Sequence, residues 1–312
     1  MQQVTILCPL YNDEASFNIF AAEIEKKTST IPDHRFSFAV INDGSSETPL
    51  LKTRLPITLI HLHRNLGHQK AIAIGLSYIQ QHLQFDKVLI MDADGEDKPE
   101  DISLLLSATS HQNIVAAGQR ASRQEGSRFK FFYYIYKMLF HLFTGTKISF
   151  GNFMLLPKTA VEKLIHHSEI WNNLPGGLLK SKIPLLLVPV HRGKRYEGKS
   201  KMHFNALLLH GLGAIGVFIE VVALRLFLFS LGMIFISIIT IIVVILIKYF
   251  TYKAIPGWAT TAISSMLVIL LQSFLLSLFT VFLYLSFQGQ RKFIPAHHYM
   301  DYVRSVENGT HE

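Results

Sequence analysis

The sequence predicts an α/β domain built on a parallel sheet, followed by helices that lie along and across a membrane. Two observations support this prediction. Short, β-rich apolar runs alternate with amphipathic helical runs in the first part of the chain, as in βαβ units. Beyond about residue 205 the composition changes from mixed to almost continuously apolar. The expected organisation is a domain at 1–202, amphipathic interfacial helices at 203–225, two spans within 226–287 joined by a loop at about 248–257, and a tail at 288–312.

The elements of the first domain follow one another in a regular order. Strands are expected at "VTILCPLY", "RFSFAVIND", "ITLIHLH" and "KVLIMDAD". Helices are expected at "NDEASFNIFAAEIEKKT", at "GHQKAIAIGLSYIQQHL" and at "PEDISLLLSAT", where Pro99 stands near the first helical position. Ligands of such sheets bind at the carboxyl ends of the strands. The polar loops "YNDE", "NDGSS" and "DADGED" come at three of those ends.

Two uncharged stretches in the second half are long enough to span a bilayer. Leu226–Ile247 has no charged residue over 22 positions, and Ala254–Gln290 is also uncharged. A span needs about 20 apolar residues. Basic residues are dense on the outer flanks of this pair, whereas the intervening loop has only Lys248 and Lys253. The positive-inside rule therefore predicts an inner-membrane, multi-pass protein with the first domain and both termini cytoplasmic.

The overall charge bears on the class of partner. The formal net charge is +8, which favours anionic partners: nucleic acid, phosphorylated small molecules or lipid headgroups. Nucleic acid is disfavoured because the clearest charged cluster is acidic and two spans anchor the chain. The single cysteine, Cys8, excludes an intramolecular disulfide and two-cysteine metal sites, and it is expected to be a small buried residue.

The acidic run "DADGEDKPED" directly follows a fully apolar strand. Asp92 and Asp94 are two residues apart, so on an extended segment their side chains point the same way. Carboxylates in a ligand crevice suit Mg²⁺ or Mn²⁺, which bind oxygen ligands and leave positions for substrate phosphate. A solvated acidic turn is the alternative, since Asp-x-Asp alone is a weak signal.

Five blocks together resemble the family-2 glycosyltransferases, and most closely their membrane-anchored polyprenyl-phosphate hexosyl and aminoarabinosyl transferases. These blocks are "CPLYNDEASF", "INDGSSE", "HRNLGHQKAIAIGL", "MDADGEDKPE" and "RYEGKSKM". The third block is the most specific match. The resemblance implies a GT-A nucleotide-diphospho-sugar transferase fold with a Rossmann-like mixed sheet.

The resemblance also implies roles for individual residues. The uridine would be held by Pro9, Tyr11, Asn12, Glu14 and Asp43, flanked by Gly67, His68 and Gln69. Asp94 would be the direct metal ligand, supported by Asp92. Arg195, Ser200 and Lys201 would lie near the donor diphosphate or the acceptor phosphate, although a membrane-surface patch also explains that basic run.

This sequence departs from the family pattern in two blocks. Asn42 replaces the first acid of the Asp-Asp-Gly-Ser turn. Ser149, Asn152 and Met154 stand where relatives have two acids and an arginine, so a candidate catalytic carboxylate is absent at 152. Because a phosphate acceptor needs no base, Asn152 is compatible with catalysis.

The leading hypothesis is an inverting hexose transfer from a nucleotide sugar, UDP-linked, to polyprenyl phosphate on the cytoplasmic leaflet. Its implied cofactor is Mg²⁺ or Mn²⁺, and association into homo-oligomers stays open. The alternatives are transfer to a lipid or glycan hydroxyl, and a catalytically silent membrane protein that binds nucleotide sugar. The basic and aromatic segment 121–145 is either an acceptor loop leading into a membrane-grazing helix or an amphipathic core helix.

Overall fold

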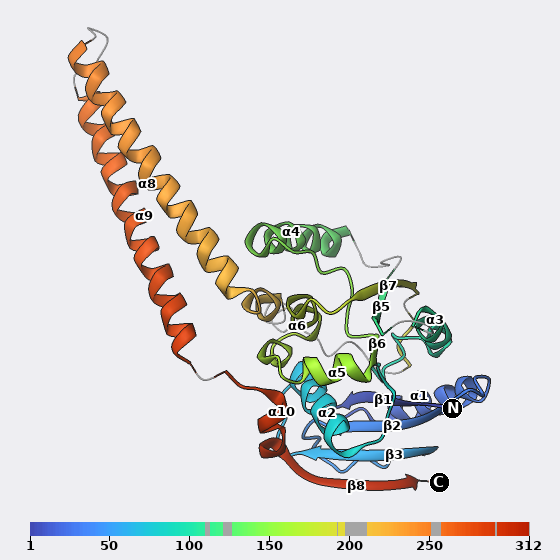
Figure 1. Ribbon diagram of the computed structural model, residues 1–312. Helices are drawn as coiled ribbons and strands as arrows, with labels where there is room; N and C mark the ends of the chain where they lie inside the picture. Colours follow the sequence, from blue (N-terminus) through green and yellow to red (C-terminus); the bar gives the residue numbers. More distant parts are fainter. Residues whose placement is uncertain are drawn as a thin grey trace. The chain divides into compact units, whose positions relative to one another are not determined.

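The computed structural model describes residues 1–109, 113–120, 127–191, 193–196, 211–250, 257–290 and 292–311. The chain forms two compact units (Figure 1). The sheet unit comprises Met1–Tyr136, Lys147–Val217 and Lys292–Glu312, and the hairpin unit comprises Lys137–Thr146 and Phe218–Arg291. The sheet unit is therefore assembled from segments on both sides of the hairpin in the sequence.

An eight-stranded sheet with the order β7-β5-β6-β4-β1-β2-β3-β8 forms the centre of the sheet unit. Its strands are β1 Gln2–Leu10, β2 His34–Asn42, β3 Thr53–Leu62, β4 Lys87–Ile90, β5 Val115–Arg120, β6 Met154–Pro157, β7 Leu185–Val190 and β8 Val303–His311. Strands β4, β1, β2 and β3 are parallel, as the alternating pattern predicts. The sheet is nevertheless mixed, because β6 runs antiparallel to β4 and β5, and β8 runs antiparallel to β3. The mixed GT-A-type sheet that the family resemblance implies is therefore confirmed.

Helices cover both faces of the sheet. The helices are α1 Glu14–Thr28, α2 His68–His82, α3 Ile102–Ala108, α5 Lys158–Leu164 and α6 Leu174–Ser181, with short 3₁₀ turns η1 Pro99–Asp101 and η2 Ser168–Trp171. On one face, Phe17 and Phe20 of α1 pack against Phe38 of β2. On the other, Gly75 of α2 lies so close to Leu7 that a Cβ would be 2.4 Å from its Cδ1. Because β1 and β2 are buried on both faces, they are apolar nearly throughout.

The return segment after the hairpin joins the sheet unit. It contains α10 Pro295–His298, η3 Tyr299–Tyr302 and β8. Phe293 packs against Trp171 with ring centroids 3.9 Å apart, and Tyr302 lies 5.3 Å from the same indole. Sequence patterning gave no sign of β8 within the segment expected as a tail, because its residues are mostly polar.

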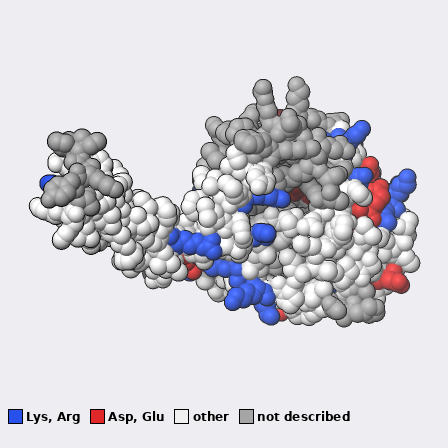
Figure 2. All heavy atoms as spheres, turned by 90° about the horizontal axis from the view of Figure 1, so that it is seen from above, with Lys and Arg blue, Asp and Glu red and all other residues white. Residues whose placement is uncertain are grey.

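The hairpin unit contains two long apolar helices, α8 Ile219–Phe250 and α9 Trp258–Gly289. Both are long and apolar enough to cross a membrane. Small residues of both helices, including Ser230, Ser237 and Ser277, are buried between them, whereas large apolar side chains point outward. Figure 2 shows most of this surface as uncharged.

Helix α8 begins before the expected span, so residues 219–225 are its first two turns rather than a separate interfacial helix. Residues 211–216 are helical, and 203–210 lie outside the described residues.

Segment 121–145 contains α4, Ser127–Thr144, which ends in the hairpin unit. Arg225 of α8 donates to the carbonyl oxygens of His141 and Leu142 at the end of α4, where a cation is favoured by the helix dipole. Large apolar side chains at Tyr134, Met138 and Leu142 are more than half exposed. This helix therefore does not bury them in a protein core, and the membrane-grazing interpretation stays a prediction.

Candidate functional site

The sequence-predicted residues converge at the carboxyl ends of β1, β2 and β4. The segments involved are 11–14 after β1, 43–46 after β2, 64–69 before and at the start of α2, and 91–97 after β4. Asn152, just before the antiparallel β6, reaches the same edge of the sheet through hydrogen bonds to α2.

Asp43 ties the turn after β2 to the start of α2. Its two carboxylate oxygens accept the backbone N–H of Leu66 at 2.7 Å and of Gly67 at 2.9 Å. Burial raises the pKa of Asp43, against the lowering effect of those two hydrogen bonds. Between the two loops only glycine fits at position 44, because φ is +68° and a Cβ would lie 2.5 Å from the backbone of Arg64. Asp43 therefore fixes the turn after β2 to the start of α2 at the candidate nucleotide site.

Asn12, which follows β1, binds the same turn after β2. Its backbone N–H donates to Ser45 Oγ at 2.9 Å, and its Oδ1 accepts from the backbone N–H of Ser46 at 2.9 Å. Glu14 is used in a similar way, since its carboxylate accepts the backbone N–H of Leu50 at 2.9 Å. Tyr11 is 44% exposed beside them, and Pro9 is partly buried in β1. The five residues expected at the uridine thus lie at the ends of β1 and β2 and at the start of α1.

The acidic run after β4 is balanced by an arginine that is distant in sequence. Arg195 Nη2 donates to Asp94 Oδ2 at 2.5 Å, and its Nε donates to Glu96 Oε1 at 3.3 Å. Asp94 Oδ1 also accepts the backbone N–H of Glu96, and Asp97 accepts that of Asp92 at 3.2 Å. The run is therefore an ordered turn rather than a merely solvated one, and Arg195 adds positive charge beside Asp94 and Glu96.

Residues 193–196 are fixed on this turn by their backbone. The backbone N–H of Gly193 donates to the backbone carbonyl oxygen of Glu96, and that of Tyr196 donates to the backbone carbonyl oxygen of Asp94. Gly95 has a φ of +87°, and a Cβ there would lie 2.8 Å from the Tyr196 ring. The Tyr196 hydroxyl donates to Glu23 of α1, and burial together with that carboxylate raises the pKa of Tyr196. Sequence reasoning missed Glu23, Glu96 and Tyr196, although the last two belong to the quoted blocks.

Asn152 lies in a hydrogen-bond network with two residues of α2. Its Oδ1 accepts from Gln69 Nε2 at 3.1 Å, so its Nδ2 is the group that donates to His68 Nε2 at 2.9 Å. Gln69 is itself oriented by the backbone N–H of Leu174, which donates to its Oε1 at 2.7 Å. These assignments place the proton of a neutral His68 on Nδ1.

The protonation of His68 is set by its surroundings. Desolvation lowers the pKa of His68 to about 4, although the Asp94 and Asp43 carboxylates act in the opposite direction and its side chain is 39% exposed. Its Nε2 also lies 3.3 Å from Asp92 Oδ1. Since the ring is neutral near pH 7, this close approach is not an ion pair there.

Other predicted residues lie elsewhere. Met154 is fully buried as the first residue of β6, within the core rather than in the crevice. Ser149 accepts from Gln119 at 2.9 Å, and Cys8 is fully buried as expected. Ser200 and Lys201 lie outside the described residues.

The carboxylates of Asp92 and Asp94 are suitable ligands for a divalent cation that also binds a substrate. Asp92 and Asp94 offer the carboxylate oxygens that Mg²⁺ and Mn²⁺ prefer. The described residues contain no group of three or more His, Cys, Asp and Glu arranged to hold an ion. A donor diphosphate and water would have to complete the coordination, and Arg195 would have to release part of Asp94.

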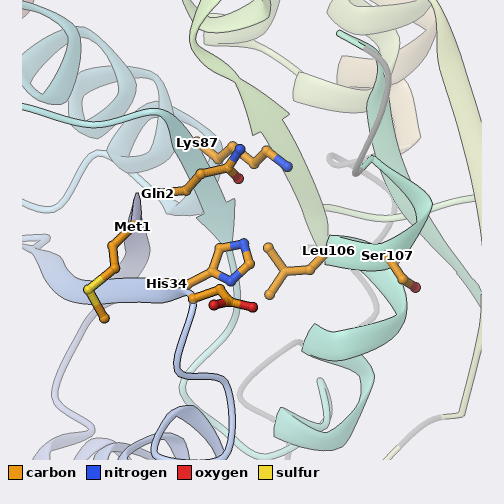
Figure 3. Close-up of a pocket in the computed structure, with 7 residues that line it drawn as sticks. Met1, Gln2, His34, Lys87, Leu106 and Ser107 are labelled. Carbon is orange, nitrogen blue, oxygen red and sulfur yellow. The ribbon is translucent and has the colours of Figure 1, made fainter.

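A hollow lies at the opposite, amino-terminal ends of β1, β2 and β4 (Figure 3). It is lined by Met1, Gln2, Asp33, His34, Lys87, Leu106 and Ser107. Lys87 is buried, and its Nζ donates to Thr109 Oγ1 at 3.0 Å. None of the predicted site residues lines this hollow.

The model of "Glycosyl transferase family 2" matches residues 5–165, just over half of the 312-residue chain. The chain belongs to glycosyl transferase family 2. The match contains the Asp43, His68, Asp94 and Asn152 segments, whereas Arg195 lies beyond it. The GT-A-type sheet of this chain thus carries the candidate site at its carboxyl edge.

Known proteins similar to this family-2 glycosyltransferase include a membrane-lipid sugar transferase. It is 29% identical over 131 residues to the undecaprenyl-phosphate 4-deoxy-4-formamido-L-arabinose transferase of Pseudomonas syringae pv. syringae (strain B728a). That match covers 40% of this chain and 37% of the relative's length.

Several solved structures also resemble this chain. One is the glucosyl-3-phosphoglycerate synthase of Mycobacterium tuberculosis in complex with Mn²⁺, UDP and phosphoglyceric acid, with 12% identity and a TM-score of 0.49 over 71% of this chain and 78% of that one. Another is the galactosyltransferase LgtC with donor and acceptor sugar analogues, with 17% identity and a TM-score of 0.37 over 59% and 73% of the two chains.

Proposed function

We propose that this glycosyltransferase moves a hexose from a UDP-linked sugar to polyprenyl phosphate at the cytoplasmic leaflet, with inversion. An oxygen of the acceptor phosphate attacks the anomeric carbon. The bond from that carbon to the donor diphosphate breaks, and its electron pair leaves with UDP. The products are the polyprenyl-phosphate sugar and UDP.

The state of Asn152 and His68 is the observation that carries this proposal. The amide of Asn152 cannot accept a proton, and the lone pair of His68 Nε2 is engaged by Asn152 Nδ2. Neither residue can therefore serve as the general base that a hydroxyl acceptor requires. A phosphate monoester has its second pKa at about 6 and arrives already mostly ionised. Position and charge compensation are then the main tasks of the protein.

The membrane features support a lipid acceptor. Helices α8 and α9 are long and apolar enough to hold the chain at a bilayer. The curated relative acts on undecaprenyl phosphate by its name. A lipid-borne phosphate would be presented at the bilayer surface, where an anchored transferase can meet it.

The donor would lie across the carboxyl edge of the sheet. Pro9, Tyr11, Asn12 and the turn at Asp43 would hold the uridine, beside Gly67. Arg195 would move from Asp94 to a phosphate group. Ser200 and Lys201 would bind phosphate beside it. Asp94, supported by Asp92, would hold Mg²⁺ or Mn²⁺, which supplies positive charge against the leaving diphosphate.

Transfer to a lipid or glycan hydroxyl is the second candidate, and silent binding of a nucleotide sugar is the third. Radiolabelled UDP-hexoses should be offered to membranes containing the full chain, with and without added polyprenyl phosphate. Membranes with the Asp94→Asn variant provide the blank. Label that enters the lipid phase only with polyprenyl phosphate is expected. Label on a hydroxyl lipid or glycan would replace the proposal with the second candidate, and no transfer of any sugar would favour the third.

A further inference from the structure

Three polar side chains connect the C-terminal strand to the donor-site turn. Glu307 is on β8, His61 is near the end of β3, and Asn42 is the last residue of β2. His61 and Asn42 are only 1% and 3% exposed, whereas the side chain of Glu307 is 49% exposed. The parallel register of β2 and β3 places Asn42 opposite His61.

The hydrogen bonds of Asn42 determine its orientation. Its Oδ1 accepts the backbone N–H of Ser45 at 3.0 Å, so its Nδ2 is the donor toward His61 Nδ1, also at 3.0 Å. A neutral His61 then carries its proton on Nε2. That nitrogen lies 3.1 Å from Glu307 Oε1.

Glu307 is the electrostatic partner of a buried N–H. The 3.1 Å separation is within hydrogen-bonding distance, but the pair does not have the geometry of a hydrogen bond, and the described residues give His61 Nε2 no hydrogen-bond partner. An unmet buried N–H is costly, so the carboxylate favours this ring state. An aspartate at position 42 would instead require a proton on Nδ1. Asn42 and Glu307 therefore suit one neutral tautomer of His61.

The contacts continue from Asn42 into the candidate nucleotide pocket. The backbone N–H of Ser45 donates to Asn42, and Ser45 Oγ accepts from the backbone N–H of Asn12. Asp43 lies between Asn42 and Ser45 in the sequence. We propose that Glu307 and His61 are positioning residues for the donor site, acting through Asn42 on the turn 42–46. This inference rests on the proposed function, in which that turn binds the uridine. The C-terminal strand thereby contributes to donor affinity without touching the donor.

The test uses the full-length protein in detergent, with Glu307→Ala, Glu307→Gln and the matched control Asn308→Ala. Asn308 is the next residue of β8 and is exposed. Titration with UDP and Mn²⁺ should show that Glu307→Ala weakens binding about fivefold. In transfer assays the kcat of Glu307→Ala should change by less than about twofold. Glu307→Gln should keep near-normal affinity, because its amide oxygen can still face the Nε2 proton. Equal affinities of Glu307→Ala and Asn308→Ala would overturn the proposal, as would equal losses in Glu307→Ala and Glu307→Gln.

A ligand-free measurement separates this proposal from the proposed function. Hydrogen exchange of peptides covering 41–50 should speed up in Glu307→Ala but not in Asn308→Ala, even if the wild-type protein binds no UDP. Asn42→Ala should produce the same change, and the double variant should add nothing further. Additive effects, or unchanged exchange in Glu307→Ala, would contradict the proposal. Thermal melting checks that Glu307→Ala folds. If it does not fold, the exchange of peptides covering 41–50 is compared between Glu307→Gln and Asn42→Ala instead.

Discussion

Asn152 donates to Nε2 of His68 from a position where the family resemblance implies an acid. Replacing Asn152 with alanine removes that hydrogen bond but no proton acceptor. We expect Asn152→Ala to retain activity within about tenfold, roughly 1.4 kcal/mol of barrier. Asn152→Asp should raise the KM of the phosphate acceptor, because an unpaired carboxylate there repels the incoming anion. Steady-state kinetics with polyprenyl phosphate measures both effects, and strong acceleration of a hydroxyl acceptor by Asn152→Asp would contradict them.

Asp94 is the residue whose charge the proposed reaction needs most. We expect Asp94→Asn to lower transfer at least a hundredfold, about 2.7 kcal/mol, and to abolish the Mn²⁺ dependence of UDP binding. Glu100→Gln is the matched control, because Glu100 is an exposed acid of the same run. Transfer assays and calorimetric titration provide the measurements. Unchanged Mn²⁺-dependent affinity in Asp94→Asn would show that the metal is held elsewhere.

The sequence predicted which loops make the candidate site better than how their side chains are used. Its apolar strands ended at the right polar turns, so Asp43, His68 and Asp94 could be placed together. It did not reveal that Asp43 and Glu14 bind backbone N–H groups, because such bonds depend on loop geometry. The pairing of Arg195 with Asp94 was also hidden, since the two residues are a hundred positions apart and only the fold joins them.

At the scale of elements, the turn after β4 and the segment 193–196 behave as one structure. Gly95 permits their contact through its positive φ and its lack of a Cβ. We expect Gly95→Ala to cost about 1–3 kcal/mol of stability and to weaken donor binding by displacing Arg195. Gly216→Ala is the control, because a Cβ there meets no atom within 4 Å. Thermal melting and UDP titration test this, and equal behaviour of the two variants would refute it.

Strands β1 to β4 were predictable because burial on both faces makes them apolar. The short strands β5, β6 and β7 were not recognised, and β8 has the polar sequence "VRSVENGTH", without a continuous apolar face. Its position is determined by pairing with β3 at the edge of the sheet. Long-range pairing of this kind leaves little periodic signal in a single sequence.

At the scale of the whole molecule, β8 constrains the topology of the hairpin. The strands β3 and β8 flank the hairpin in sequence and pair in one sheet. If α8 and α9 both cross the bilayer, the two flanking segments must therefore lie on the same side. The Lys and Arg asymmetry predicts that this side is the cytoplasm.

Cysteine labelling tests this orientation with little background, because the single native cysteine, Cys8, is fully buried. Phe250, at the end of α8, is 81% exposed, and Met300 of the return segment is 52% exposed. An impermeant maleimide should label Phe250→Cys in intact cells. It should label Met300→Cys only after permeabilisation. The reverse pattern would place the sheet unit outside the cytoplasm.

The position of β8 also sets the order in which the protein can be completed during synthesis. Both hairpin helices are translated before β8. One edge of β3 therefore stays unpaired while α8 and α9 leave the ribosome. Edges of this kind attract wrong partners, and pairing between distant segments is slow. The sheet therefore closes only after the hairpin has been made. A chain stalled before β8 is translated would lack this strand, so the eight-stranded sheet is completed only with the last part of the sheet unit.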